Sequence, residues 1–126
     1  MRRTAWKKRI RNACVAAGTY KDYFEIAIAE LAIILERRDG ASALYDEDPR
    51  PVIEFTNKTG ATNVIKNPLL VLIDDLDKTA LAYWRDLGLT PAGLRKINEK
   101  TFKEKEEKAN GLMDRLIELR KVQGNG

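Results

Sequence analysis

The sequence predicts a mainly α protein, a bundle of about four helices with a small β-hairpin within residues 52–66. Three observations lead to this fold class. Apolar residues recur at helical spacing through much of the chain, Gly, Pro and Asn residues punctuate these stretches, and two short β-prone runs flank a turn-rich segment. The 126 residues are 44% hydrophobic and 33% charged, which suits one domain with its own core.

The N-terminal segment combines a helical stripe with a concentration of positive charge. Trp6, Ile10 and Cys14 fall on one stripe, and Gly18 ends it. The first twelve residues contain no acid and six basic residues, which are Arg2, Arg3, Lys7, Lys8, Arg9 and Arg11. These cations are candidates for phosphate contacts with DNA, the alternative being a solubilising or assembly arm. The spacing of Trp6 and Ile10 favours core packing of the indole over stacking on bases.

The next helix is predicted over residues 20–39, where apolar residues cover more than one face. Such a helix is buried on several sides, and a small domain offers few neighbours. We therefore expect self-association, with a central core helix in a monomer as the alternative. The candidate oligomerisation residues are Tyr23, Ile26, Ile33 and Ile34. Asp39-Gly40 is expected to end this helix, and residues 41–50 are expected to form a loop.

Two short β-prone runs, 52–55 and 64–65, flank a segment rich in Asn, Thr and Gly. They favour a small hairpin, with an irregular loop as the alternative. An isolated hairpin is marginal in water, so it would need helices or a neighbouring subunit to pack against.

A third helix is predicted from Asn67-Pro68 to about Leu87, because its apolar residues follow the i, i+3, i+4, i+7 pattern closely. These residues are Leu69, Leu72, Ile73, Leu76, Ala80, Tyr83, Trp84 and Leu87. The stretch 87–91, Leu-Gly-Leu-Thr-Pro, then turns a tight corner. Gly88 supplies a left-handed C-terminal residue, Thr90 an N-cap and Pro91 a first helical residue.

The last helix begins at Pro91, with Leu94, Ile97 and then Thr101 or Phe102 expected to point inward. Arg95 and Lys96 lie in its second turn, where a recognition helix would present them to DNA, although an ordinary helical hairpin has the same pattern. Asn110-Gly111 is expected to break the helix and to separate a domain over residues 1–110 from a tail over 111–126. The tail carries a short amphipathic stretch that packs on the core or docks a partner. Its candidate docking residues are Leu112, Met113, Leu116 and Leu119.

Composition excludes several kinds of chemistry. The chain has no histidine and one cysteine, Cys14, which rules out an internal disulfide, a Cys/His zinc site and a Ser-His or Cys-His nucleophile pair. Neighbouring helical positions such as Asp74 and Asp75 point in different directions and cannot converge on a metal pair. There is no phosphate-binding Gly-rich loop. We therefore expect no catalytic residue, no metal, no cofactor and no enzymatic activity. The absence of a signal sequence and of a long apolar run predicts a cytoplasmic protein without a membrane partner.

The order Asn67-Pro68, one helix, the 87–91 corner and a basic turn at Arg95-Lys96 resembles the phage terminase small-subunit family over roughly residues 20–100. The resemblance implies a non-catalytic, ring-forming subunit in the host cytoplasm. Such a subunit binds double-stranded viral DNA and recruits a large subunit that carries the ATPase and the nuclease. It also implies that helix 20–39 lies between subunits, that the basic segment faces DNA and that the stretch 112–119 docks the large subunit. Many members have a helix-turn-helix domain before this core, whereas here only about eighteen residues precede it.

Two other classes of function remain open at this point. One is a small helix-turn-helix transcriptional regulator, which would act as a dimer on half-sites one helical turn apart. The chain lacks a recognition helix rich in Gln, Asn, Ser and Arg, which weighs against that class. The other is a scaffolding protein whose basic segment binds an acidic partner instead of DNA. Salt-sensitive DNA binding and the size of the oligomer would separate the three classes.

Overall fold

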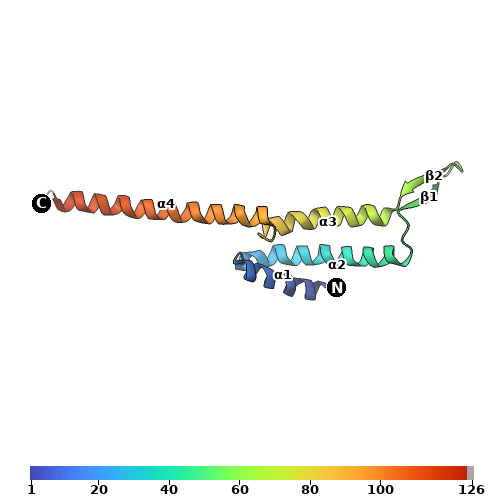
Figure 1. The fold of residues 1–126 in the computed structure, drawn as a ribbon, viewed down its shortest axis with the longest axis horizontal. Helices are drawn as coiled ribbons and strands as arrows, with labels where there is room; N and C mark the ends of the chain where they lie inside the picture. The colour runs from blue at the N-terminus through green and yellow to red at the C-terminus, as the bar shows by residue number, and fades with distance from the viewer. Residues whose placement is uncertain (125–126) are drawn as a thin grey trace.

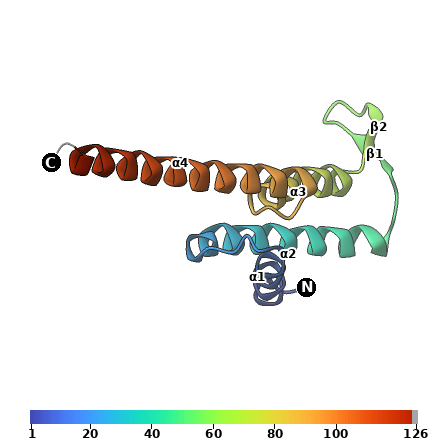
Figure 2. The same cartoon turned by 60° about the vertical axis from the view of Figure 1, so that its left-hand side comes forward.

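The computed structural model describes residues 1–124 and confirms a mainly α fold with one hairpin. In chain order, the elements are α1 (Arg3–Ala17), a 3-10 turn (Asp22–Phe24), α2 (Glu25–Glu47), β1 (Val52–Thr56), β2 (Thr62–Lys66), α3 (Pro68–Asp86) and α4 (Pro91–Gly124). α2 lies in the middle, with α1 on one side and α3 on the other (Figure 1). α4 extends past the end of α2, away from the rest of the molecule, and the view in Figure 2 shows the same projection.

The core forms where α1 and α3 meet α2. The predicted stripe of α1 is confirmed, because Trp6, Ile10 and Cys14 are all buried. They join a cluster with buried residues of α2 and with residues at the end of α3. The fully enclosed members from α2 and α3 are Ile28, Leu31, Ala32, Leu35, Ala80 and Leu87.

The turn after α1 connects this helix to the end of α3. Gly18 has φ 74°, a left-handed conformation that favours glycine and ends α1. The buried Thr19 follows, and its Oγ1 donates a hydrogen bond of 2.8 Å to the carbonyl of Leu87 at the end of α3. Thr19 thus connects the end of α1 to the corner between α3 and α4.

α2 is longer than the sequence predicted, and its expected end at Asp39-Gly40 is wrong. The helix begins at Glu25, after the 3-10 turn, and continues to Glu47, so most of the expected loop over 41–50 is helical. Gly40 does not adopt a positive φ, and Ala41 beyond it is buried, which keeps the helix packed. The helix ends instead just before Pro49, where proline disfavours a helical conformation of the preceding residue.

The hairpin is confirmed as an antiparallel pair in which Val52 faces Lys66 and Thr56 faces Thr62. The Asn57 side chain organises the turn, since its Oδ1 accepts hydrogen bonds from the backbone N–H groups of Thr59 and Ala61. Both strands are mostly exposed, and the hairpin projects at the end of the molecule opposite to the tip of α4 (Figure 1).

The corner between α3 and α4 forms as its sequence predicts. Asn67 caps α3, with its Oδ1 accepting from the N–H of Leu69, and Gly88 ends α3 with φ 74°. The Oγ1 of Thr90 accepts from the N–H of Gly93 at 3.1 Å, which is the expected N-cap. Gly93 is buried, and a Cβ at this position would overlap the carbonyl oxygen of Arg85. The two helices therefore approach each other at backbone distance.

α4 corrects two expectations about the C-terminal part. The helix continues unbroken through Asn110-Gly111 to Gly124, and Thr101 and Phe102 are exposed, not turned inward. A glycine inside a helix costs only about 1 kcal/mol relative to alanine, which the Lys, Glu and Leu residues around it readily offset. Asn125 and Gly126, the end of the expected tail, lie outside the described residues.

Candidate nucleic-acid interface and partner surfaces

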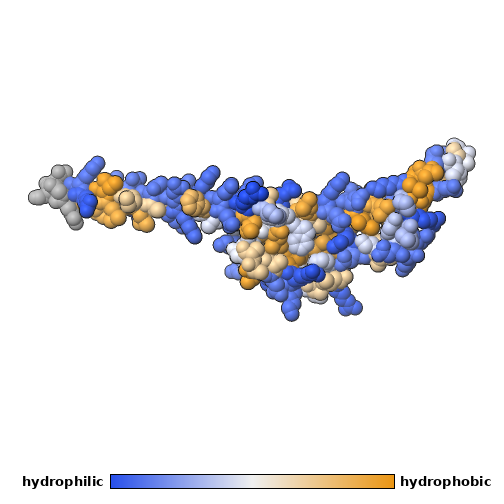
Figure 3. Space-filling view, viewed as in Figure 1, coloured by the Kyte–Doolittle hydropathy of each residue, from blue (hydrophilic) through white to orange (hydrophobic). Residues whose placement is uncertain are grey.

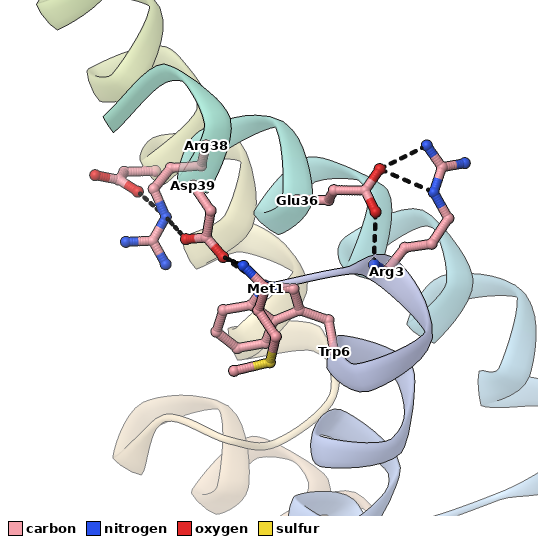
Figure 4. A network of polar contacts seen from close by, with 7 residues as sticks. Met1, Arg3, Trp6, Glu36, Arg38 and Asp39 are labelled. Atoms are coloured by element: carbon pink, nitrogen blue, oxygen red, sulfur yellow. Dashed lines mark hydrogen bonds and ion pairs between the residues drawn. The ribbon is translucent and has the colours of Figure 1, made fainter. Parts of the chain in front are cut away.

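A polar network holds α1 against α2. Asp39 lies at its centre, where its Oδ2 accepts hydrogen bonds from the indole Nε1 of Trp6 at 2.8 Å and from the N-terminal amino group of Met1 at 3.1 Å (Figure 4). Arg38 extends the network, with its Nε 3.4 Å from Asp39 and 3.7 Å from Asp77 of α3. The indole of Trp6 is therefore part of the packing, as its spacing predicted.

Two of the six candidate DNA-binding cations are neutralised within the chain. Arg3 donates from Nε and Nη2 to Glu36 at 3.0 and 2.8 Å, and the backbone N–H of Arg3 also donates to this carboxylate (Figure 4). Arg11 makes a two-pronged contact of the same kind with Glu25, at 2.7 Å for each hydrogen bond. These pairs position α1 and leave less charge for a nucleic acid.

The pKa values of the two acids report how strongly the arginines hold them. The Arg11 guanidinium, helped by the hydroxyl of Tyr20, lowers the pKa of Glu25 to about 2. Hydrogen bonds from the side chain and backbone of Arg3 lower the pKa of Glu36 in the same direction. Both carboxylates are charged at neutral pH, so both ion pairs persist there.

The remaining cations of α1 lie outside the buried stripe. Arg2, Lys8 and Arg9 are exposed, and Lys7 is half-buried. Within residues 1–124, none of these four side chains makes an ion pair. Arg9 stacks over the Trp6 ring, 5.5 Å from its centroid, which orders the guanidinium without neutralising it. The positive surface of α1 is therefore smaller than the sequence suggested.

The second basic pair is remote from the first. Arg95 and Lys96 are exposed in the second turn of α4, while Leu94 and Ile97 beside them are half-buried. Both views place α1 and α4 on opposite sides of α2 (Figures 1 and 2). A single chain therefore does not bring its two candidate basic groups to one surface.

The candidate oligomerisation residues of α2 divide into two groups. Tyr23 and Ile26 are exposed, at 74% and 79%, although both are large apolar side chains. Ile33 is half-buried, and Ile34 is half-buried and packs against the core cluster. Among residues 1–124, no other element covers Ile26 on its side of α2.

The candidate docking residues of α4 form an apolar stripe on the projecting part of the helix. Leu112, Met113 and Leu116 are each 60% exposed, and Leu119 is similar. Figure 3 shows apolar groups along α4 away from the rest of the molecule. Ile117 and Val122 are also exposed and belong to this segment, although Val122 was not among the candidate docking residues. An apolar stripe of this kind is typical of a contact surface.

The described residues hold no other assembled site. Among residues 1–124, there is no group of three or more His, Cys, Asp or Glu side chains that could hold a metal ion. The search of the same residues also finds no helix with the length and apolar character required to span a bilayer.

A comparison with protein families decides the relationship of this chain. A family model described as "Phage terminase, small subunit" matches residues 3–104. The chain belongs to the phage terminase small-subunit family. The match runs from α1 into the first half of α4, so the apolar stripe of α4 lies beyond it, and the family connects the chain to phage DNA packaging. Searches of curated proteins and of solved structures return no match.

Proposed function

We propose that this chain is a non-catalytic small terminase subunit that binds double-stranded viral DNA, assembles into a ring and recruits the large subunit inside the host cell. In this proposal, the large subunit supplies the ATPase and nuclease activities. The observation that carries it is the projecting α4, whose apolar stripe stays exposed among the residues that the structure describes. Membership of the terminase small-subunit family supports the same division of labour.

The proposed DNA contact uses Arg2, Lys8 and Arg9, the exposed unpaired cations near the N-terminus, with the half-buried Lys7 beside them and Arg95 and Lys96 as a second group. Each cation that neutralises a phosphate releases counterions and steepens the dependence of affinity on salt, by about 0.9 log units per contact. Arg3 and Arg11 act differently, because their ion pairs with Glu36 and Glu25 position α1. In an assembly, several copies of α1 would add their charges along one DNA molecule.

Replacing Arg2, Lys8 and Arg9 by alanine tests this contact. We expect the slope of log affinity against log salt to fall by about 2 to 3, measured by fluorescence anisotropy with duplex DNA. The control replaces Lys103, Lys105 and Lys108 of α4, which removes the same charge from another exposed place. Equal losses in the two triple variants would show that the net charge, not α1, binds DNA.

The proposed large-subunit contact uses the stripe of α4. Replacing Leu112 and Leu116 by Gln should abolish co-purification with the large subunit while the mass of the small-subunit assembly stays unchanged. Both side chains are exposed, so the fold of the single chain is expected to tolerate the change. The matched control replaces Asp114 and Lys121 by alanine, because helical spacing places them on the other side of the same segment. Recruitment that survives the Leu substitutions would contradict this contact.

A further inference from the structure

Within the described part of α4, only the first two turns are covered by the body of the molecule (Figure 1). Gly93 is buried and Leu94 and Ile97 are half-buried, whereas every residue from 98 to 122 is exposed. Because the helix is held at one end, a small tilt there moves its far part a long way. At about 1.5 Å per residue, Leu116 lies about 28 Å beyond Ile97, so a tilt of about 10° would move this leucine by about 5 Å. The position of the apolar stripe therefore depends on what fixes the first turns.

The corner before α4 packs against the turn that follows α1. Thr19 in this turn is 3% exposed, and its Oγ1 lies 2.8 Å from the carbonyl oxygen of Leu87 and 3.4 Å from that of Cys14. A hydroxyl group has one proton to donate, and the Cys14 carbonyl already accepts from the backbone N–H of Thr19 at 3.0 Å. The hydroxyl therefore donates to Leu87, at the end of α3.

The same threonine also packs against the first turns of α4. A Cβ built on Gly88 would lie 2.7 Å from Cγ2 of Thr19 and 2.7 Å from Cδ1 of Ile97. The methyl group of Thr19 and the side chain of Ile97 thus pack over the backbone of Gly88, which leaves no room for a side chain at this position. Thr19, Gly88 and Ile97 come from three parts of the chain, and we call them the α4 joint.

The α4 joint is attached to α1, and α1 is attached to α2. The backbone N–H of Thr19 bonds to the last turn of α1, where Gly18 ends the helix in a left-handed conformation. Arg11 of α1 in turn donates two hydrogen bonds of 2.7 Å to Glu25 of α2. A displacement of α1 would therefore displace Thr19, and with it one side of the joint.

We propose that Thr19 is a positioning residue that sets the direction of α4 through the α4 joint, and thereby the position of the apolar stripe relative to α1. Thr19 contacts neither the stripe nor the candidate DNA-binding cations, and it acts through Leu87, Gly88 and Ile97. Its effect on recruitment rests on the proposed contact between the stripe and the large subunit, whereas its effect on the direction of α4 does not.

The distance between two spin labels measures the direction of α4. The labels are attached to Arg37→Cys in α2 and Asp114→Cys in α4, since both residues are exposed and neither belongs to the joint or to the apolar stripe. The native Cys14 is fully buried and stays unlabelled. Labelled protein is diluted with an excess of unlabelled protein, so that pulsed electron paramagnetic resonance reports the distance within one chain.

Thr19→Val removes the hydroxyl group and keeps the shape of the side chain. We expect this variant to shift or broaden the distance distribution by about 5 Å, the displacement that a tilt of about 10° produces. Thr19→Ser keeps the hydroxyl and should retain most of the native distribution. Thr101→Val makes the same replacement at an exposed position of α4 and serves as the control. A native distribution in Thr19→Val would overturn the proposal.

A second variant tests the joint from the side of α4. Ile97→Ala removes the Cδ1 that packs over Gly88, and the half-buried side chain makes loss of the fold a smaller risk than at Thr19. We expect the same shift or broadening of the label distance. Circular dichroism checks that each variant folds. If Thr19→Val does not fold, an unchanged distance in Ile97→Ala overturns the proposal by itself.

Binding of the large subunit separates this inference from the proposed function. We expect Thr19→Val to weaken that binding by about fivefold or more, although Thr19 is remote from the stripe. Native binding in Thr19→Val, together with a loss in the variant that replaces Leu112 and Leu116, would leave the proposed function in place and overturn the role of Thr19 in recruitment. Native binding in the leucine variant would contradict the proposed contact, and the label distance would still decide whether Thr19 sets the direction of α4.

Discussion

α2 and α4 are both long helices with many large apolar residues, but their surroundings differ. α2 contacts α1 on one side and α3 on another, and it supplies four of the fully enclosed core residues. α4 contacts the body only near its start, where Leu94 and Ile97 are half-buried, and the rest of the helix projects. The comparison teaches that the apolar content of a helix does not by itself decide whether its residues form a core or a contact surface.

Replacing one leucine in each helix by alanine should reveal the largest difference between α2 and α4 in the free energy of unfolding. Leu31→Ala in α2 removes a fully buried side chain and should lower the free energy of unfolding by about 2–5 kcal/mol. Leu116→Ala in α4 should change it by less than about 0.5 kcal/mol, because the side chain is exposed. Urea unfolding of the two variants at equal protein concentration provides the measurement. Equal losses would mean that α4 packs in solution against a surface of its own assembly.

Two glycines of α4, Gly93 in its first turn and Gly111 in its projecting part, distinguish the packed start of the helix from the rest. Gly93→Ala should destabilise the chain by about 1–3 kcal/mol, because the new Cβ would overlap the carbonyl oxygen of Arg85. Gly111→Ala meets nothing within 4 Å and should raise helix stability by up to about 1 kcal/mol. Thermal unfolding followed by circular dichroism would detect both changes. A neutral Gly93→Ala would contradict the close approach of α3 and α4.

The ion pair between Arg11 and Glu25 gives the smallest effect, and it is visible through pH. The pKa of Glu25 in the folded chain is about 2, below the ordinary value of 4.5, so the folded state binds this proton less readily than the unfolded state. The pair therefore stabilises the fold fully above about pH 4.5 and loses this contribution as the pH falls toward 2. We expect the melting temperature of Glu25→Gln to fall less steeply over this range than that of the native chain. Parallel curves would show that the pair does not hold α1.

Much of the local structure could be predicted from the sequence. The stripe of Trp6, Ile10 and Cys14, the hairpin within residues 52–66 and the corner at Gly88 and Thr90 all formed as expected. Each depends on groups within a few residues of one another, such as a cap, a left-handed glycine or side chains one helical turn apart. Interactions between residues so close in the sequence form regardless of how the rest of the chain folds.

The ends of helices and the roles of charges were harder to predict. Gly40 and Gly111 suggested the ends of helices. A glycine ends a helix when it adopts a left-handed conformation. Neither glycine does so here, and both helices continue. Arg3 and Arg11 looked equivalent to Arg2 and Arg9 in a run of basic residues, yet only the first two lie opposite acids of α2. Nothing within the first twelve residues contains this distinction.

The sequence by itself determined the mainly α fold, the hairpin, the corner at residues 87–91 and the family, because these depend on local patterns and on residue order. The tertiary structure decided which cations stay unpaired, which side of α2 is left uncovered and that α4 stands away from the core. The physical reason is the distance along the sequence between the residues that interact. Ion pairs such as Arg3–Glu36 join residues 33 positions apart, and an uncovered face is defined only once α1 and α3 have occupied the other two.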